Sequence, residues 1–318
     1  MSRRSENPLV SIVVPVLDEE GCVGELVRRV RDALAGADVR FELIFVDDGS
    51  RDGTAEKIAA LRRADPAVKW IRFTRSFGHQ AALSAGLRHA RGDAVVTMDG
   101  DLQHPPEALP TLIEAWRGGA DVVNTLRRLP GGARLEWKEA LGRAFYRLMG
   151  LFSAVPVVPT SAEFRLLDRR AVDALNALEE HFVFTRGLVP WLGFPETRIE
   201  YELGERFAGE SKYDLWRMLR LAADGIVSFS TLPLRAIALV GLASVLFAVA
   251  FGVFTLVAHV TGHVEGSGWT TLVVLILLFG GVQLLCLGLL AEYVGRIYEE
   301  VKRRPRYVIE AADGIERS

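Results

Sequence analysis

Two long apolar stretches in the C-terminal third constrain this chain more than any other feature of its sequence. Residues 236–258 and 269–291 contain no Asp, Glu, Lys or Arg. Each stretch is about 23 residues long, and about 20 apolar residues suffice for a helix to cross the hydrocarbon core of a membrane. The sequence therefore predicts two transmembrane helices, over 236–258 and 269–291, within a membrane segment at residues 234–295.

The charges that flank these stretches predict their orientation. The link at residues 259–268 has no Lys or Arg, whereas Arg235 precedes the first stretch and several basic residues follow the second. Lys and Arg concentrate in the cytoplasmic loops of membrane proteins. We therefore expect an integral membrane protein with a hairpin whose two ends are cytoplasmic. The preceding domain and both termini would then be cytoplasmic too, with residues 296–318 as a basic tail.

The first 212 residues alternate short apolar strands with helical segments. Strands are predicted at residues 10–16, 41–46, 68–73 and 94–98, and a helix follows each of the first three. Such alternation predicts an α/β domain with a mostly parallel, Rossmann-like sheet, which binds ligands at the carboxyl ends of its strands. Neither a G-x-G-x-x-G nor a P-loop sequence is present, which argues against the dinucleotide-binding and P-loop ATPase classes.

Acidic residues follow three of these strands. Asp18, Asp47 and Asp99 each come just after a predicted strand, so the sheet would gather them at one edge. Asp99 and Asp101 lie two residues apart, and side chains at that spacing on an extended backbone point to the same side. Carboxylates suit Mg²⁺ or Mn²⁺, and Gln103 could add a third oxygen. The alternative for an isolated Asp-x-Asp triplet is a solvated turn.

Two further segments have the pattern of amphipathic helices with basic flanks. Residues 134–152 place Leu and Phe side chains on one stripe beside Arg143, and residues 213–233 repeat the pattern beside Arg217 and Arg220. A core helix with a solvated basic edge is one interpretation. A helix that lies on the membrane surface is the other, and the presence of two such segments favours it.

The overall charge and the cysteines exclude other classes of protein. A net charge of −2 and a pI near 6.3 indicate no concentrated basic surface, so no nucleic acid is expected as a partner. The chain has two cysteines, Cys22 and Cys286, which lie far apart in the sequence and form no CxxC motif. Neither a disulfide framework nor a zinc site is predicted.

Several motifs, taken in order, resemble one enzyme family. They are VVPVLDEE, VDDGSRDGT, RSFGHQAALSAGLRHARGD, TMDGDLQHPPE, EFRLLDRR and RFAGESKYDLWRMLRLAADGIVSFSTLPLR, followed by the two apolar stretches. With these motifs the chain resembles the polyprenyl-phosphate glycosyltransferases of glycosyltransferase family 2, the group that includes dolichyl-phosphate mannose synthase and undecaprenyl-phosphate glucosyltransferases. The resemblance covers nearly the whole chain. It implies a GT-A fold, a nucleotide-sugar donor and a polyprenyl phosphate acceptor in a bacterial-type inner membrane.

The resemblance also implies roles for residues around the donor. The positions that hold its base and ribose match Pro15, Leu17, Glu19 and Asp47. The positions that hold the metal ion and the donor diphosphate match Asp99, Asp101 and Gln103. A mobile loop at residues 206–212 would reach the donor phosphates through Arg206, Ser211 and Lys212. The expected catalytic residues are Asp99, Asp101 and Arg206.

The acceptor phosphate is expected on basic residues. The resemblance assigns it to Arg127 or Arg128, just after the apolar run that ends near Thr125, together with Arg143 in the following amphipathic helix. Arg165 is either a further acceptor ligand or an ion-pair partner of Glu163.

Three residues depart from the usual pattern of the family. Asp18 stands where Asn is usual, Gly100 where Ala is common, and Glu163 where an Asp commonly precedes Phe-Arg. Asp18 adds a negative charge near an anionic donor, and Glu163 is longer than Asp by one methylene. The QxxRW motif of processive synthases is absent, which favours a single transfer.

The expected reaction is the inverting transfer of one sugar to undecaprenyl or dolichyl phosphate, with release of nucleoside diphosphate. A divalent cation would stabilise charge on the leaving diphosphate. The lipid phosphate has a second pKa of about 6, so it needs no strong base, and we interpret His79 and His104 as hydrogen-bonding groups. UDP-glucose and UDP-N-acetylglucosamine are the favoured donors, and GDP-mannose also fits the motifs.

Two other classes of function remain open from the sequence. A membrane-bound nucleotidyl- or sugar-1-phosphate transferase would release pyrophosphate or nucleoside monophosphate instead. A non-catalytic scaffold or lipid-flipping accessory, built on a degenerate transferase domain, would bind no donor. The sequence also leaves open whether the protein forms a homo-oligomer.

Overall fold

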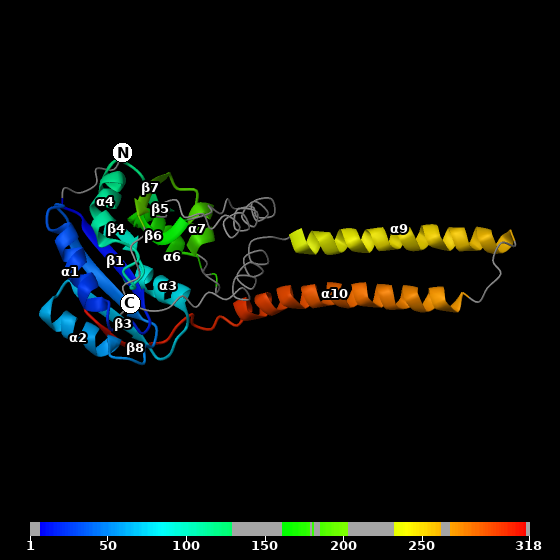
Figure 1. Cartoon of the computed structure of the whole chain (residues 1–318), viewed down its shortest axis with the longest axis horizontal. Coiled ribbons are helices and arrows are strands. Elements are labelled where there is room, and N and C mark those ends of the chain that lie inside the picture. Colours follow the sequence, from blue (N-terminus) through cyan, green and yellow to red (C-terminus); the bar gives the residue numbers. More distant parts are fainter. Residues whose placement is uncertain are drawn as a thin grey trace. The chain divides into compact units, whose positions relative to one another are not determined.

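The computed structural model describes residues 7–128, 161–178, 180, 185–202, 232–261 and 268–315. The chain divides into two compact units. One unit contains the α/β domain together with the last residues, from Arg304 on, and the other contains the two long apolar helices (Figure 1). The predicted helix at 134–152, the loop at 206–212 and nearly all of the segment at 213–233 lie outside the described residues.

Four parallel strands form the centre of the α/β domain, as the alternating pattern predicts. β1 (Leu9–Val16) pairs with β2 (Arg40–Asp47) and with β4 (Ala94–Thr97), and β2 pairs with β3 (Val68–Phe73). The connecting helices are α1 (Val23–Leu34), α2 (Thr54–Ala64) and α3 (His79–His89). Because these strands run in one direction, the carboxyl ends of β1, β2 and β4 meet at the same edge of the sheet.

The sheet extends beyond this centre through strands that run in both directions. β6 (Ser161–Asp168) lies antiparallel between β4 and β5 (Val122–Arg128), and β7 (Glu196–Glu202) is parallel to β5. Within the described residues the strand order is β7-β5-β6-β4-β1-β2-β3-β8. The expected class, a mixed α/β domain with a mostly parallel sheet, is confirmed. The remaining described elements of this domain are η1 (Pro106–Ala108), α4 (Leu109–Arg117), α6 (Arg169–Asn176) and α7 (Thr185–Trp191).

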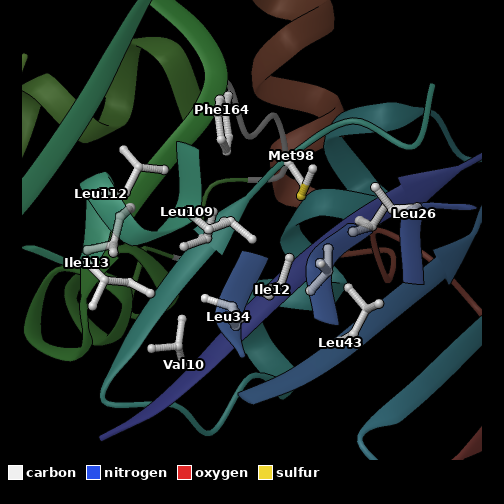
Figure 2. Close-up of a cluster of buried hydrophobic side chains, with 14 of the residues drawn as sticks. Val10, Ile12, Leu26, Leu34, Leu43, Met98, Leu109, Leu112, Ile113 and Phe164 are labelled. Atoms are coloured by element: carbon white, nitrogen blue, oxygen red, sulfur yellow. The ribbon is translucent and has the colours of Figure 1, made fainter. Parts of the chain in front are cut away.

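A hydrophobic core fills the space between the sheet and the helices α1 and α4 (Figure 2). Val10, Ile12 and Val14 alternate along β1 and belong to this core, because alternate residues of a strand share one face. α1 contributes residues spaced at helical intervals, namely Val23, Leu26, Val30 and Leu34. On the opposite face α3 approaches β1 closely, and a Cβ added to Gly86 would lie 2.1 Å from Val13 Cγ1. The central strands are therefore buried on both faces.

The last described residues return to the sheet. β8 (Ile309–Asp313) lies antiparallel to β3, and just before it the Tyr307 ring stacks on Phe73 with centroids 4.9 Å apart. Arg306 donates to the Leu178 carbonyl oxygen at 2.9 Å. The sequence predicts a basic tail over residues 296–318, whereas the structure places residues 296–301 in a helix and 309–313 in a strand. β8 is short and mostly exposed. Its sequence lacks the alternation of apolar and polar residues that predicts a strand.

Removal of this last segment is expected to destabilise the domain. A chain truncated after Arg304 loses β8 and the Tyr307 ring, which should cost about 1–3 kcal/mol of unfolding free energy. Thermal unfolding of the detergent-solubilised protein measures this loss. The matched control is Tyr307→Phe, which keeps the stacked ring and should unfold within 1–2 °C of the parent chain, a shift worth about 0.5 kcal/mol or less. An unchanged midpoint after truncation would show that β8 contributes nothing to stability.

The second unit contains two helices long and apolar enough to cross a membrane. They are α9 (Leu232–Val260) and α10 (Trp269–Val301), and their candidate spans have mean hydropathies of 2.6 and 2.7. The predicted stretches 236–258 and 269–291 lie inside these helices. Phe247 of α9 and Phe279 of α10 approach to 6.5 Å between ring centroids. Most of the large apolar side chains in these helices are exposed, as expected of surfaces that face lipid rather than a protein core.

Candidate active site

The loops that leave β1 and β2 are tied together at the carboxyl edge of the sheet. Asp18 N donates to Ser50 Oγ at 3.0 Å, and Asp18 Oδ1 accepts from Arg51 N at 2.8 Å. Glu19 N donates to Thr54 Oγ1 at 2.9 Å. Asp18 has a φ of 57°, a left-handed conformation that Asn and Asp adopt more readily than most residues. The departure at Asp18 therefore has a structural explanation, because either Asn or Asp suits this turn.

The predicted nucleoside-binding residues differ in their surroundings. Leu17 is 46% exposed at this edge, whereas Pro15 is buried in β1 and Glu19 is partly buried. Asp47, the last residue of β2, is fully buried. Its Oδ1 accepts from Ser50 N at 2.8 Å, and its Oδ2 lies 3.6 Å from Arg72 Nε. Asp47 thus orders the loop that follows β2.

The neighbouring Asp48 holds the start of α3. Its carboxylate accepts from Ser76 Oγ and from Phe77 N, both at 2.7 Å, and from Gly78 N at 3.0 Å. No role for Asp48 is predicted from the sequence. Because α3 begins at His79, this buried carboxylate fixes the first turn of the helix that reaches the acidic loop after β4.

The Asp99-Gly100-Asp101 turn follows β4 in a constrained conformation. Asp99 N donates to Nδ1 of the buried His104 at 2.9 Å, and Asp101 Oδ1 accepts from Gln103 N at 3.1 Å. A Cβ on Gly100 would lie 2.7 Å from Val16 Cγ1, so the turn is pressed against the end of β1. Leu102 is buried in the core with a φ of 61°, which is unusual for a large side chain and typical of strained functional loops.

Asp99 is the electrostatic centre of this turn. Its side chain is 31% exposed, and its Oδ1 lies 3.0 Å from Nε2 of His79, the first residue of α3. Burial alone would raise the pKa of Asp99, but the hydrogen bond from His79 and the electrostatic effects of His79 and Arg186 hold it well below its usual range. Asp99 is therefore ionised at neutral pH. The pKa of His79 is raised, because the interactions with Asp99 and Glu163 outweigh the effect of burial.

The acidic turn after β4 suits a hard divalent cation that takes some of its ligands from water and from a bound substrate. Asp99 and Asp101 supply two carboxylates on one short turn, and Gln103 supplies an amide oxygen beside them. Among the described residues, no group of three or more His, Cys, Asp or Glu side chains is arranged to hold a metal ion. A cation on these two acids would draw its remaining ligands from Gln103, water and donor phosphates, as Mg²⁺ commonly does in phosphate-binding sites.

β6 brings a buried acid, Glu163, to the level of Asp99. Thr97 pairs with Arg165 in the antiparallel β4–β6 ladder, so Glu163 lies beside the turn that follows β4. Thr97 Oγ1 donates to the Glu163 carbonyl oxygen. The Glu163 side chain is 3% exposed, and burial would raise its pKa. The charges of Arg165, Arg186 and His79 and the hydrogen bond from Thr185 lower it instead, so this acid is ionised in the core.

Four side chains from three elements contact the Glu163 carboxylate. Gln80 Nε2 of α3 donates to Oε1 at 3.2 Å, and Arg186 Nε of α7 donates to the same oxygen at 2.8 Å. Thr185 Oγ1 donates to Oε2 at 2.9 Å, and Arg165 Nη2 lies 3.6 Å from it. Glu163 is therefore a junction of α3, β6 and α7.

The predicted acceptor residues fall into three groups. Arg165 is buried and forms the ion pair with Glu163 that the sequence analysis considered as one of its two roles. Arg127 and Arg128 are the last residues of β5, opposite Tyr201 and Glu202 of β7. Arg143, the remaining predicted acceptor residue, lies outside the described residues, as do the predicted donor-binding residues Arg206, Ser211 and Lys212.

The residues that join α7 to the site are not predicted by the sequence motifs. Gln80 lies within one of these motifs, but no role is predicted for it. Thr185 and Arg186 lie in no recognised motif, and only the antiparallel path of β6 brings Glu163 to them. Thr185 and Arg186 lie more than twenty residues after Glu163 in the chain. Local sequence spacing does not predict contacts between residues so far apart.

Comparison with known proteins agrees with this architecture. The model of the family "Glycosyl transferase family 2" matches residues 11–175, which is more than half of the chain. YkcC of Bacillus subtilis, an uncharacterized glycosyltransferase, is 40% identical over 96% of this chain and 94% of its own length. The SfII prophage-derived bactoprenol glucosyl transferase of Shigella flexneri is 41% identical over 94% of this chain and 97% of its own length.

A solved structure with a similar fold is the mannosyltransferase PcManGT from Pyrobaculum calidifontis in complex with GDP-Man and Mn²⁺. It is 20% identical, with a TM-score of 0.48 over 70% of this chain and 62% of its own. The family is shown by the sequence comparisons alone, namely the family match and the relatives at about 40% identity. The chain belongs to glycosyltransferase family 2.

Proposed function

We propose that this protein transfers one sugar from a nucleotide sugar to a polyprenyl phosphate, with inversion at the anomeric carbon and release of nucleoside diphosphate. The observation that carries the proposal is the extent of the match to the bactoprenol glucosyl transferase of Shigella flexneri. That match covers 94% of this chain, so it includes both the catalytic domain and the apolar helices. The name of this relative, a bactoprenol glucosyl transferase, supports undecaprenyl phosphate as the proposed acceptor, and dolichyl phosphate has the same reacting group.

The proposed donor is a uridine nucleotide sugar, UDP-glucose first and UDP-N-acetylglucosamine second, with GDP-mannose as the alternative. The exposed Leu17 at the carboxyl edge of the sheet supports contact with a flat base. Asp99 is ionised, lies on the same edge and is partly exposed, so the donor diphosphate is proposed to bind there through a metal ion. In this proposal Arg206, Ser211 and Lys212 contact the donor phosphates, and Arg127, Arg128 and Arg143 contact the acceptor phosphate.

The metal ion in this proposal is Mg²⁺ or Mn²⁺, held by Asp99, Asp101 and Gln103. When bound, it would offset the negative charge that develops on the leaving diphosphate. The residues of the chain have separate tasks. His104 fixes the backbone of Asp99, and His79 fixes the orientation of its carboxylate. The lipid phosphate is already largely ionised at neutral pH, so the mechanism needs no strong general base.

The proposed location is the inner membrane of a bacterial cell, with the catalytic domain and both termini in the cytoplasm. The distribution of Lys and Arg around the hairpin supports this orientation. β8 adds support, because residues after α10 pair with β3 of the same domain that precedes α9. Two crossings return the chain to the side from which it entered, as this pairing requires.

The proposed function is tested with membranes that contain the protein. They are incubated with labelled UDP-glucose, UDP-N-acetylglucosamine or GDP-mannose and with undecaprenyl or dolichyl phosphate, and both products are identified. We expect a sugar linked to the prenyl phosphate and release of nucleoside diphosphate. Release of nucleoside monophosphate or pyrophosphate would indicate one of the other transferase classes. Absence of donor binding in a calorimetric titration would favour a non-catalytic scaffold or lipid-flipping accessory.

A further inference from the structure

The strongest feature that the proposed mechanism does not use is the environment of Arg186. Its Nε donates to Glu163 Oε1 at 2.8 Å, and its side chain is 36% exposed. Arg165, the other arginine on this carboxylate, is 2% exposed. Glu163 therefore contacts one cation that is enclosed in the core and a second that is open to the surroundings.

Glu163 faces two guanidinium groups in different surroundings. A single buried carboxylate is balanced by one buried guanidinium, and Arg165 provides it at 3.6 Å. Arg186 then brings a second positive charge to the same carboxylate. An anchored guanidinium that is partly exposed suits an anion from outside the fold, because its two Nη groups carry donors in a fixed fork.

The position of Arg186 relative to the acidic turn follows from α3. Consecutive residues of its first turn reach the two acids, since His79 contacts Asp99 at 3.0 Å and Gln80 contacts Glu163 at 3.2 Å. Gln80 Oε1 also accepts from Thr185 N at 3.2 Å and lies 3.0 Å from Thr185 Oγ1. The first turn of α3 thus joins the acidic turn to the start of α7. The positive charge of Arg186 also contributes to the lowered pKa of Asp99.

We propose that Arg186 is a phosphate-binding residue of the transfer site and that Glu163 holds its guanidinium in place. This inference rests on the proposed function, because both substrates of that reaction carry phosphate. The group bound is either the diphosphate of the nucleotide sugar or the phosphate of the prenyl lipid. In either case Arg186 offsets the repulsion between two anionic substrates that must approach each other.

The experiment compares three variants of the full-length protein in detergent. Arg186→Gln keeps a donor for Glu163 but removes the charge, and Arg186→Lys keeps the charge but loses the planar fork. Arg28→Ala is the matched control, because Arg28 is an exposed arginine of α1 that pairs with Glu25 and Asp32. Calorimetry measures the dissociation constants of UDP or GDP with Mn²⁺ and, separately, of farnesyl phosphate, a short soluble prenyl phosphate.

The expected result is that Arg186→Gln weakens one of these two ligands by about 10-fold or more, as the loss of a charged hydrogen bond predicts. Arg186→Lys should lose less, and Arg28→Ala should match the parent chain. Weaker nucleotide binding assigns Arg186 to the donor diphosphate, and weaker farnesyl phosphate binding assigns it to the acceptor. Unchanged dissociation constants for both ligands would overturn the proposal.

A purely structural role for Arg186 gives a different result. It would lower the thermal midpoint and the fraction of molecules able to bind, while the dissociation constant of the folded molecules would stay the same. Failure of the proposed function is also distinguishable. It would appear as absence of the sugar-lipid product with the parent chain, whatever the two dissociation constants of the Arg186 variants are.

Discussion

Asp101→Asn is expected to lower the rate of sugar transfer by about 10²–10³-fold or more, the range in which loss of a main electrostatic contribution to catalysis falls. Asn has nearly the same shape as Asp, so the hydrogen bond from Gln103 N can persist. What disappears is one of the two carboxylates on the turn after β4. The measurement is transfer of labelled sugar to undecaprenyl phosphate at several Mn²⁺ concentrations. The variant should need far more Mn²⁺ for any remaining activity.

The control for this variant is Asp173→Asn. Asp173 is a 62% exposed acid of α6 that pairs with Arg169, so its replacement removes the same charge away from the acidic turn. We expect parent activity and parent Mn²⁺ dependence from it. Treatment with EDTA should abolish transfer by the parent chain, and added Mn²⁺ or Mg²⁺ should restore it. Full turnover by Asp101→Asn would exclude the proposed metal-binding role.

Glu163→Ala is expected to have the largest effect on stability. It leaves the buried guanidinium of Arg165 without its carboxylate partner, and removal of one member of a buried ion pair costs about 3–5 kcal/mol. The contacts of Gln80, Thr185 and Arg186 with this carboxylate are lost as well. Thermal unfolding in detergent should show a midpoint lower by about 10 °C. A change of only 1–2 °C would mean that the surrounding residues compensate for the missing carboxylate.

The conservative control is Glu163→Asp, which introduces the residue that the family resemblance implies at this position. It keeps the charge but shortens the side chain, so the midpoint should lie between those of Glu163→Ala and the parent. The same cluster predicts a dependence on pH. The pKa of Glu163 is lowered in the folded state, so its stabilising contribution is present above the usual carboxyl pKa of about 4.3. That contribution is lost as the pH falls below this value. The stability difference between the parent and Glu163→Gln should therefore shrink in acid.

The sequence predicts most of the half of the site that β1 to β4 form. Apolar runs bounded by turn residues are local signals, so β1 to β4 and the acidic residues after them could be located from spacing alone. The two apolar helices are equally local signals, because length and the absence of charge are sufficient. The predicted ranges of the four strands agree with the structure to within one position, whereas α10 continues ten residues beyond the predicted stretch.

The other half depends on contacts between residues far apart in the sequence. β6 enters the sheet antiparallel between β4 and β5, and no periodicity in EFRLLDRR predicts that position. As a result, the partners of Glu163 on α7 could not be predicted, although Glu163 itself was noted. Asp18 shows the opposite case, since the sequence marks it only as an added negative charge near an anionic donor. Its backbone conformation and its bond to Arg51 N account for it instead.

The return of β8 to the sheet has a consequence for synthesis on the ribosome. More than 230 residues separate the end of β3 from the start of β8, which takes roughly 10 to 50 s to translate at 5–20 residues per second. During that interval β3 is an open edge strand, a feature that invites pairing with other chains. Lys69 and Arg72 place positive charges on this strand, and charged edges resist such pairing. The nascent domain therefore stays incomplete until both apolar helices have left the ribosome, and pairing of β8 closes its edge last.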